Sequence, residues 1–403
     1  MRQKRLMLLG GLRYLKPVID AAHELGYYVI TADYLPGNIA HEWSDEYCNV
    51  SIIDKEAVLR EARRLRIDGI LSHAVDPGVI SAAYVAEKMG LPFQCSYKAA
   101  CILQDKSLFR KFLSDNGFNC PWAKGYDNLK EAIADSPGFP YPLIVKPVDS
   151  AGSKGVCRVD GPDGLLAAIE LAMSQSHAGR FIIEEFLEKE GYSAGSESFV
   201  VDGELMYNGF YDQYFDSGAI NPFTPSAECW PSVMPGIYQE EIRNELQRLV
   251  SLLHITTGIF NVEFRVCKNG KPYLMEVSPR GGGNRLAEIL NYAADVNLID
   301  AEVRKAVGLP LPDIHEPNYR GCYAIQVLHA DETGSFDHLE IDPSFEKEYV
   351  IEKELRVSEG DPVPVFSGAQ AAIGTLFLRS DDRAAMDSIL KDIGRYARVV
   401  VRS

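Results

Sequence analysis

The sequence predicts an α/β and α+β protein of several domains, with a doubly wound parallel sheet first and a small α/β module last. The chain has 403 residues, enough for two to four domains at roughly 100–200 residues each. Apolar residues make up 46% of it and charged residues 24%, a composition typical of globular cores. The first hundred residues alternate strands with helices, which indicates a parallel sheet with helices on its faces.

The N-terminal domain is expected to contain alternating strands and helices that end at turn residues. We expect strands at 5–9, 27–31 and 69–72, and helices at 15–25, 55–66 and 78–89. Gly26 and Gly90 mark two helix ends. Ligands of such sheets lie at the carboxyl ends of the strands, where His73 and Asp76 follow the third strand. A single histidine in such a turn is more often structural than catalytic.

A glycine pair after the first strand favours a dinucleotide site only weakly. Gly10 and Gly11 are followed by Asp33 at the end of the second strand, as in dinucleotide-binding proteins. The spacing G-G-x-x-x-x-P lacks the third glycine, which lets the helix approach the sheet closely. We therefore interpret the segment as a tight turn with a strand-end carboxylate, and a dinucleotide oxidoreductase is one alternative function.

The middle and end of the chain are expected to form a small α+β unit, a larger β-rich unit and a C-terminal module. An amphipathic helix follows Asp105 and ends through Gly117 and Pro121. Further elements are expected at 128–135, 143–146, 156–159, 162–173, 180–184, 198–201, 205–211, 239–254, 259–266, 273–277, 284–291, 371–378, 383–393 and 397–401. The predicted domains are 1–104, 105–186, 187–312 and 313–403.

The segment 215–236 is expected to be a structureless loop because it holds Pro222 and three further prolines. Loops of this length are more often functional than filler, and we expect this one to shape substrate specificity. Trp230 within it is either a substrate contact or a packed anchor.

The charge balance disfavours two classes of partner. Lys and Arg number 41 against 57 Asp and Glu, a net charge of −16, which disfavours binding to nucleic acids or anionic membranes. No window approaches the ~20 apolar residues of a membrane span, and the apolar run 6–9 is too short for a secretory signal. The eight cysteines form no CxxC pair, so we expect reduced thiols in a cytoplasmic protein.

Two glutamates on a predicted hairpin indicate a metal site. Glu263 and Glu276 lie on strands joined by an Asn-Gly turn at 269–270, so their carboxylates can converge. Paired carboxylates suit Mg²⁺, which binds one or two of them together with substrate phosphates. Arg280 follows four residues after the second glutamate.

Two lysines and a small-residue loop favour a phosphate site. Lys146 ends an apolar strand, where a solvated lysine is poorly placed, and Lys106 lies in the first turn of a helix, where the macrodipole disfavours a cation. An anionic ligand would offset that cost. The loop 149–155 reads Asp-Ser-Ala-Gly-Ser-Lys-Gly, and such residues let backbone N–H groups surround a phosphate. Taken alone, each lysine is more often structural and the loop an ordinary hairpin turn.

A strand that runs into acidic residues completes the pattern. The segment 181–187 reads Phe-Ile-Ile-Glu-Glu-Phe-Leu. A chain that leaves a strand edge can offer a C=O and an N–H to adenine, although an ordinary strand end has the same pattern.

The order of these motifs resembles that of the ATP-grasp superfamily, over essentially the whole chain. The resemblance implies a pre-ATP-grasp α/β domain, a small lid, a large metal-binding subdomain and a C-terminal module. The chain is similar to biotin carboxylase, the carbamoyl phosphate synthetase large chain and the L-amino acid ligases. The stretch 276–285, Glu-Val-Ser-Pro-Arg-Gly-Gly-Gly-Asn-Arg, most resembles the last group.

The resemblance implies a role for each matching residue. Lys106 and Lys146 would bind the ATP phosphates, and the loop would close over them with Ser150, Gly152, Ser153, Lys154 and Gly155. Adenine would be held by the Glu185 carbonyl and the Leu187 N–H, with Phe186 between them and Glu184 near the adenine amino group. Glu190 would bind the ribose, and Glu263, Glu276 and Ser278 would bind Mg²⁺, or alternatively Mn²⁺. Arg280, with Arg285, would hold the acyl phosphate or the substrate carboxylate, and Lys146 would assist catalysis.

One departure from the family pattern concerns the second metal. Many members have Glu-x-Asn where this chain has Glu276-Val-Ser278, so a hydroxyl replaces an amide ligand, and a water can fill the position.

The function that the resemblance implies is an ATP- and Mg²⁺-dependent ligase, which activates a carboxylate as an acyl phosphate and joins it to an amine. The alternatives within the class are a bicarbonate-using carboxylase and a carbamoyl-phosphate-type enzyme, and outside it a non-catalytic nucleotide-binding protein. The expected partners are small-molecule carboxylates and amines, without nucleic acid or membrane. A homodimer through the N-terminal or C-terminal domain is also expected to be feasible.

Overall fold

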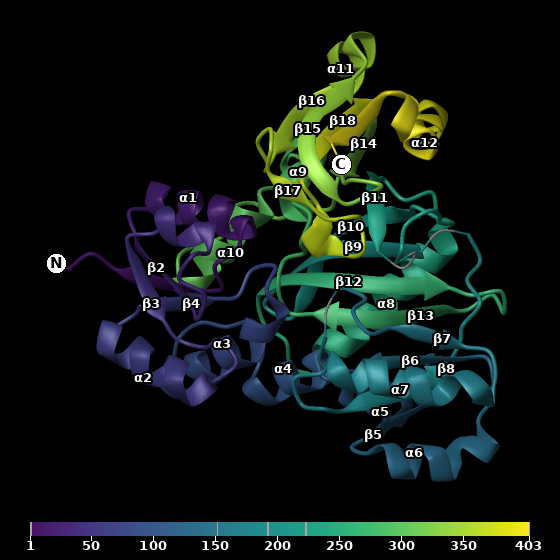
Figure 1. The fold of residues 1–403 in the computed structure, drawn as a ribbon. Helices are drawn as coiled ribbons and strands as arrows, with labels where there is room; N and C mark the ends of the chain where they lie inside the picture. The colour runs from purple at the N-terminus through teal and green to yellow at the C-terminus, as the bar shows by residue number, and fades with distance from the viewer. Residues whose placement is uncertain (1, 151, 192, 222–223, 403) are drawn as a thin grey trace.

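The computed structural model describes residues 2–150, 152–191, 193–221 and 224–402. The N-terminal part of the chain forms a parallel sheet (Figure 1). The strand order is β3-β2-β1-β4 and neighbouring strands are parallel. The strands are β1 (Arg5–Leu9), β2 (Tyr28–Asp33), β3 (Glu46–Asn49) and β4 (Gly69–Leu71), and the helices are α1 (Lys16–Glu24), α2 (Lys55–Leu65) and α3 (Asp76–Met89). The predicted parallel sheet is confirmed. β3 was not predicted, because this short edge strand is only half buried and has no apolar run.

The carboxyl ends of these strands carry the turn residues in two different roles. The Asp33 carboxylate accepts hydrogen bonds from the Leu35 N–H (3.1 Å) and the Asn38 amide (2.9 Å), as a strand-end turn residue does. His73 lies 2.6 Å from Glu302 and both are buried, so this histidine is structural. Asp76 begins α3 and points into the pocket described below.

The next unit is a small antiparallel sheet with the order β5-β8-β6-β7. Its strands are β5 (Ala123–Tyr126), β6 (Leu143–Pro147), β7 (Cys157–Val159) and β8 (Phe181–Glu185), and its helices are α6 (Leu129–Asp135) and α7 (Leu165–Ser174). Two helices lead into it, α4 (Tyr97–Gln104) and α5 (Lys106–Asp115). The Asp105 side chain caps α5 by accepting from the N–H groups of Ser107 and Leu108, so Lys106 is the first helical residue.

An eight-stranded sheet crosses the centre of the molecule in the order β13-β12-β9-β10-β11-β14-β18-β16 (Figure 1). Its strands are β9 (Ser193–Val201), β10 (Glu204–Phe215), β11 (Pro225–Trp230), β12 (Gly258–Val266), β13 (Pro272–Ser278), β14 (Cys322–Leu328), β16 (Val350–Leu355) and β18 (Gly374–Ser380). Its helices are α8 (Gly236–Leu252), α9 (Leu286–Ala294) and α10 (Leu298–Ala306). The sheet is antiparallel throughout.

The C-terminal residues extend this sheet and add a smaller one. β14, β16 and β18 continue the large sheet beyond β11, so the sheet crosses the proposed boundary at 312. A three-stranded sheet lies beside them with α11 (Pro343–Tyr349) and α12 (Arg383–Lys391), and its strands are β15 (Gly334–Ile341), β17 (Pro362–Val363) and β19 (Ala397–Arg402). In the described part of the chain, no helix combines the length and apolar character needed to cross a membrane.

Two sequence-based expectations about local structure were wrong. The segment 215–236 is not structureless, because β11 lies within it and pairs with β10 and β14. Trp230 is fully buried and its Nε1 donates to the Gly209 carbonyl at 3.1 Å, so it is a packed anchor; Pro222 lies outside the described residues. The helix expected from Asn284 starts at Leu286, because Asn284 and Arg285 have left-handed φ values of 53° and 68°.

Candidate active site

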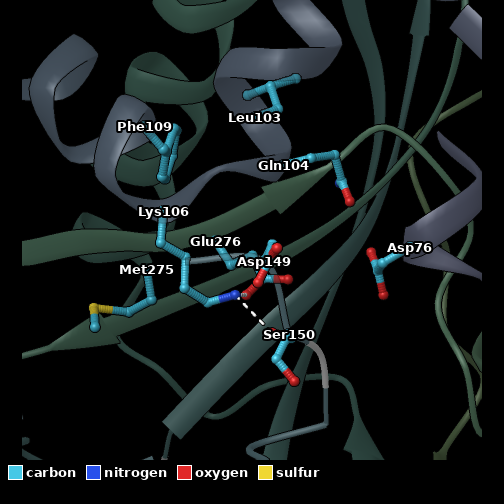
Figure 2. A pocket seen from close by; sticks show the side chains of 9 residues that line it. All are labelled: Asp76, Leu103, Gln104, Lys106, Phe109, Asp149, Ser150, Met275 and Glu276. Carbon is cyan, nitrogen blue, oxygen red and sulfur yellow. Dashed lines mark hydrogen bonds and ion pairs between the residues drawn. The ribbon is translucent and has the colours of Figure 1, made fainter. Parts of the chain in front are cut away.

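One pocket brings together the start of α5, the loop after β6 and the end of β13 (Figure 2). Figure 2 shows the Lys106 ammonium pointing toward the oxygens of Glu276, Asp149 and Ser150, while Gln104 and Asp76 approach from the opposite side. The pocket is lined by Asp76, Leu103, Gln104, Lys106, Phe109, Asp149, Ser150, Met275 and Glu276. Residues more than 170 positions apart thus share one small polar space.

Lys106 is held between the two sheets. Its Nζ donates to the Ser150 carbonyl at 2.9 Å and lies 3.4 Å from Glu276 Oε2. Burial disfavours the ammonium, but the charges of Glu276 and then Asp76 outweigh it, and the pKa of Lys106 is raised. Lys106 therefore stays charged at neutral pH despite its place at a helix N-terminus.

Lys146 belongs to a buried ionic triad in the small sheet. Its Nζ lies 2.5 Å from Glu184 Oε1, and Arg110 Nε lies 2.9 Å from Glu184 Oε2. Burial opposes the charge of Glu184, but Arg110 and Lys146 outweigh it and lower the pKa of the carboxyl to about 2. Burial, partly offset by Glu184, lowers the pKa of Lys146 to about 8. The predicted phosphate lysine is thus positioned by two residues from other elements.

The two predicted metal-binding glutamates face each other. β12 and β13 form the expected hairpin, and its register places Glu263 directly opposite Glu276. Desolvation and then repulsion from Glu276 raise the pKa of Glu263 to about 7. A divalent cation between two oxygen ligands would relieve this repulsion, so the donor set fits Mg²⁺.

Ser278 and Arg280 meet at Asp76. Arg280 binds Asp76 through two hydrogen bonds, from Nε at 2.8 Å and from a terminal nitrogen at 2.7 Å. The Ser278 hydroxyl donates to Asp76 at 3.0 Å and accepts from the Gln104 amide at 3.2 Å. Burial opposes the charge of Asp76, but Arg280 outweighs it and lowers the pKa of the carboxyl. Asp76 therefore orients both residues beside the pocket.

Arg285 lies in an ion-pair network that reaches the C-terminal strands. It donates to Glu288 at 3.0 and 2.8 Å and also to Glu352, and its guanidinium lies 4.3 Å from the Phe377 ring centre. It is not among the residues that line the pocket. Its predicted catalytic role stays a prediction, and the contacts seen here serve to dock α9 on β16 and β18.

The glycine loop has the backbone that close approach to a ligand requires. Gly152, Ser153 and Gly155 have left-handed φ values of 67°, 56° and 70°, which glycine adopts without strain. Lys154 is exposed, and Asp149 accepts from Ser176 and the Ala178 N–H at 2.7 and 2.8 Å, which fixes the loop entrance. Ala151 lies outside the described residues.

The predicted adenine segment leaves the small sheet at the end of β8. Glu185 is the last residue of the strand, and the N–H of Phe186 donates to the Pro142 carbonyl at 3.0 Å. Leu187 is buried in a cluster that includes Met275, a pocket residue. Glu190 is exposed, as a ribose ligand at the mouth of the site would be.

Sequence reasoning missed four polar residues at or near this site, of which Arg110, Glu197 and Glu228 are buried and Asn261 is half-buried. Arg110 sits on the apolar face of α5, and Asn261, Glu197 and Glu228 lie on strands of the large sheet. A charged residue within an otherwise apolar or small-residue strand was the available signal. This signal can be assigned to the site only when the strand register is known, because the register decides which face of the sheet carries the side chain.

Comparisons with known proteins identify a domain that spans most of these residues. Residues 103–284 match the model of the ATP-grasp domain. The chain is 26% identical over 318 residues to a formate-dependent phosphoribosylglycinamide formyltransferase of Parasynechococcus marenigrum (strain WH8102), covering 77% of this chain and 78% of the relative.

Two solved structures share the fold over the whole chain. The crystal structure of L-amino acid ligase from Bacillus licheniformis superposes with a TM-score of 0.81 at 19% identity and 100% coverage of both chains. The biotin carboxylase domain of 2-oxoglutarate carboxylase from Hydrogenobacter thermophilus, in complex with MgADP and bicarbonate, has a TM-score of 0.74 at 15% identity, with 100% of this chain and 92% of that chain covered. Residues 103–284 therefore match an ATP-grasp domain, and the whole chain has the fold of ATP-grasp ligases.

Proposed function

We propose that this protein is an ATP- and Mg²⁺-dependent ligase that activates a carboxylate as an acyl phosphate and joins it to an amine. The observation that carries the proposal is the position of Lys106, whose ammonium lies between the Ser150 carbonyl of the glycine loop and Glu276 of the carboxylate pair. An ammonium there faces both phosphates and a metal. The formyltransferase relative and the ligase of shared fold support the same reaction class.

ATP binding is assigned to the cleft between the small and the large sheet. Lys106 and Lys146 bind the phosphates, and the loop 149–155 closes over them with backbone N–H groups. The Glu185 carbonyl and the Leu187 N–H bind adenine, and Glu190 binds the ribose.

Glu263 and Glu276 are the proposed Mg²⁺ ligands, with Ser278 completing the set directly or through a water. Mg²⁺ supplies charge stabilisation for the phosphate oxygens when bound. The related fold in complex with MgADP supports this choice of ion, and Mn²⁺ offers the same octahedral oxygen chemistry.

The chemistry consists of two transfers. A carboxylate oxygen attacks the γ-phosphorus of ATP, the bond to the bridging oxygen breaks, and ADP leaves. The amine nitrogen then attacks the acyl carbon, the carbon–oxygen bond to phosphate breaks, and the nitrogen loses a proton. Catalysis rests on positioning and on cations near the developing charge. Arg280, fixed by Asp76, is the proposed ligand of the acyl phosphate or substrate carboxylate.

The proposed setting is the cytoplasm, where ATP and small carboxylates and amines are available. The acidic balance of −16 leaves small molecules rather than polyanions as partners. A homodimer is compatible with this function. We propose that the start of the 215–236 loop contributes to substrate selection, since Asn221 reaches the Ser153 carbonyl of the glycine loop at 3.5 Å.

The decisive experiment is a mass-spectrometric screen for ATP-dependent condensation in pools of carboxylates and amines. ADP, phosphate and a new amide mass are the expected products. Strict dependence on bicarbonate would instead indicate a carboxylase or carbamoyl-phosphate-type enzyme. Micromolar ATP binding without turnover in any pool would indicate a non-catalytic nucleotide-binding protein.

A further inference from the structure

One face of the large sheet carries polar side chains well beyond the metal-binding pair. Residues that are directly paired, or two apart on a strand, share a face. Glu263 pairs with Gly195 and Asn261 pairs with Glu197, so Glu197 shares the face of the metal carboxylates. Gly195 pairs in turn with Tyr211 of β10, and the Tyr211 ring packs where a side chain on Gly195 would lie.

The same face continues to β11. Gln213 is two residues beyond Tyr211 and pairs with Glu228, so the Glu228 side chain is on the face that carries Glu263. The electrostatics agree with this register, because the charge of Glu263 acts on Glu228 and both act on Tyr211. A path of polar groups therefore leads from the metal-binding pair across β9 and β10 to Glu228.

The two buried carboxylates on this path differ in their partners. Both oxygens of Glu197 are used, one by the Asn261 amide at 2.6 Å and the other by the Gly282 N–H at 3.0 Å. Glu228 accepts from the Asn284 amide at 3.2 Å through Oε1. Its Oε2 is buried and has no hydrogen-bond partner among the described residues, although the side chain is only 2% exposed.

The segment 281–284, called the roof below, lies against this face through hydrogen bonds from Gly282 to Glu197 and from Asn284 to Glu228. The bond from Asn284 holds the Glu228 carboxylate, including its unpartnered oxygen, in position. A Cβ on Gly282 would lie 2.6 Å from Glu197 Oε1 and 2.5 Å from Leu286 Cδ1, so only glycine fits there. Asn284 takes a left-handed φ of 53° to present its amide to Glu228. The roof thus satisfies one Glu228 oxygen and leaves the other for a group from outside the chain.

A buried carboxylate oxygen without a donor is costly unless a ligand satisfies it. The ligand must bring an N–H or O–H donor, and a cationic nitrogen gives the strongest bond. An anion without a donor hydrogen cannot satisfy a carboxylate oxygen, which only accepts. We propose that Glu228 Oε2 binds the amino nitrogen of one substrate, so that one substrate is a small amino-bearing molecule lying along this face beyond the metal-binding pair. This assignment rests on the proposed ligase function and names the substrate class and the residue that selects it.

Binding, rather than turnover, gives the sharpest test. The twenty common L-amino acids are titrated calorimetrically into the full chain, with ADP and Mg²⁺ present, for the wild type and for Glu228→Gln. The substitution keeps the size and the Asn284 contact but replaces Oε2 by an N–H₂ group. We expect at least one probe to bind the wild type and to bind Glu228→Gln at least tenfold more weakly, while the affinity for ADP changes less than twofold.

Three control measurements test whether the loss of affinity depends on the amino group of the probe. Glu228→Asp keeps the charge and should bind the best probe more tightly than Glu228→Gln does. The deamino analogue of that probe should bind the wild type and Glu228→Gln equally. Glu302→Gln is a matched control, because Glu302 is also buried with one unpartnered oxygen but is bonded to His73 instead of Asn284, and its probe affinity should equal that of the wild type.

Equal affinity of the wild type and Glu228→Gln for the probes, or no binding of any amino probe, would overturn the assignment. A fall in affinity that the deamino analogue shares would overturn it as well, because the effect would then be structural. Binding that follows the expected pattern without ADP formation from ATP would leave the subsite intact and instead contradict the ligase function. Thermal unfolding of each variant confirms that it is folded before titration.

Discussion

Glu184 and Glu228 are both 2% exposed, but they stand in opposite electrostatic surroundings. Arg110 and Lys146 overcome the cost of burying Glu184 and lower the pKa of its carboxyl to about 2. Burial of Glu228, with only the Asn284 amide to offset it and Glu263 adding repulsion, raises the pKa of that carboxyl to about 7. On the nucleotide side of the site, which holds Glu184, two cations of the chain balance the buried carboxylate. On the opposite side, which holds Glu228, no cation of the described residues does so.

The difference shows how the chain divides its charges between two ligands. A side that must bind triphosphate keeps its cations fixed on a buried carboxylate, so that they do not move when the nucleotide leaves. On the side proposed to bind an amine, no cation pairs with Glu228, and the substrate would bring the positive charge. The following substitutions test the two sides, beginning with the residue that lies between them.

Glu276→Ala should have the largest effect. Glu276 lies 3.4 Å from Lys106 on the nucleotide side and opposite Glu263 on the other, so its loss disturbs both. We expect ADP formation to fall at least about 100-fold, the scale seen when one charge-stabilising group is removed from an active site. The far-UV circular dichroism spectrum should be unchanged, since the side chain is partly exposed. Full activity would contradict both the metal assignment and the bridging role.

Lys146→Met should chiefly reduce stability and ATP affinity. The substitution removes one charged hydrogen bond from Glu184 and leaves Arg110 as its remaining cation, and a hydrogen bond to a charged group contributes about 1.5–3 kcal/mol. Urea unfolding measures the loss, and the KM for ATP should rise in parallel. The double variant Lys146→Met/Glu184→Gln should be less stable than the single variant, because it leaves the buried Arg110 guanidinium without a carboxylate, and it should not recover the ATP affinity. Unchanged stability of the single variant would show that the triad is not coupled.

Glu197→Gln should remove a pH dependence of stability. Burial raises the pKa of Glu197 to about 7, although the Gly282 N–H, the Asn261 amide and the charges of Arg280 and His73 oppose the shift. Because the folded state binds the proton more tightly, stability falls as pH rises from about 4.5 to 7, by on the order of 3 kcal/mol. The variant should flatten that part of the profile of melting temperature against pH.

The nucleotide side gives the opposite sign and serves as the control. The lowered pKa of Glu184 contributes stability that is present above about pH 4.5 and is lost as pH falls toward 2. Glu184→Gln should therefore flatten the acid limb of the profile below about pH 4.5, which Glu197→Gln should leave unchanged. Glu184→Gln also lowers the pKa of Lys146, which the charge of Glu184 supports, so the comparison is made on the acid limb alone. If Glu197→Gln altered that limb, the contrast between the two sides would be wrong.

Much of the fold and part of the site could be predicted from the sequence because their signals are local. Helical and strand periodicity located the N-terminal parallel sheet, and the Asn-Gly turn placed Glu263 opposite Glu276, as the structure confirms. Lys106 and Ser150 were assigned to one site through the order of motifs, and they are in contact.

What the sequence did not reveal depends on partners far along the chain. Glu228 lies in β11, whose prolines resembled a loop, and its role follows from pairing with Gln213 and from a roof residue 56 positions later. In the sequence, Arg110 is a single charge on the apolar face of a helix, and its partner Glu184 lies 74 positions later on β8. Strand register and domain packing supply this information, and no spacing rule encodes them.

Arg285→Met tests the residue where sequence and structure point in different directions, and its effect should be the smallest. The family resemblance implies a role at the substrate, but the guanidinium donates to Glu288 and Glu352 and lies over Phe377. We therefore expect a loss of about 1.5–3 kcal/mol in unfolding free energy, the range for hydrogen bonds to charged groups. The kcat for ADP formation should fall less than tenfold, and the KM for ATP should stay constant. A fall in kcat of a hundredfold or more at unchanged stability would return Arg285 to the catalytic set, because docking of α9 on the C-terminal strands cannot lower the rate without also lowering the stability.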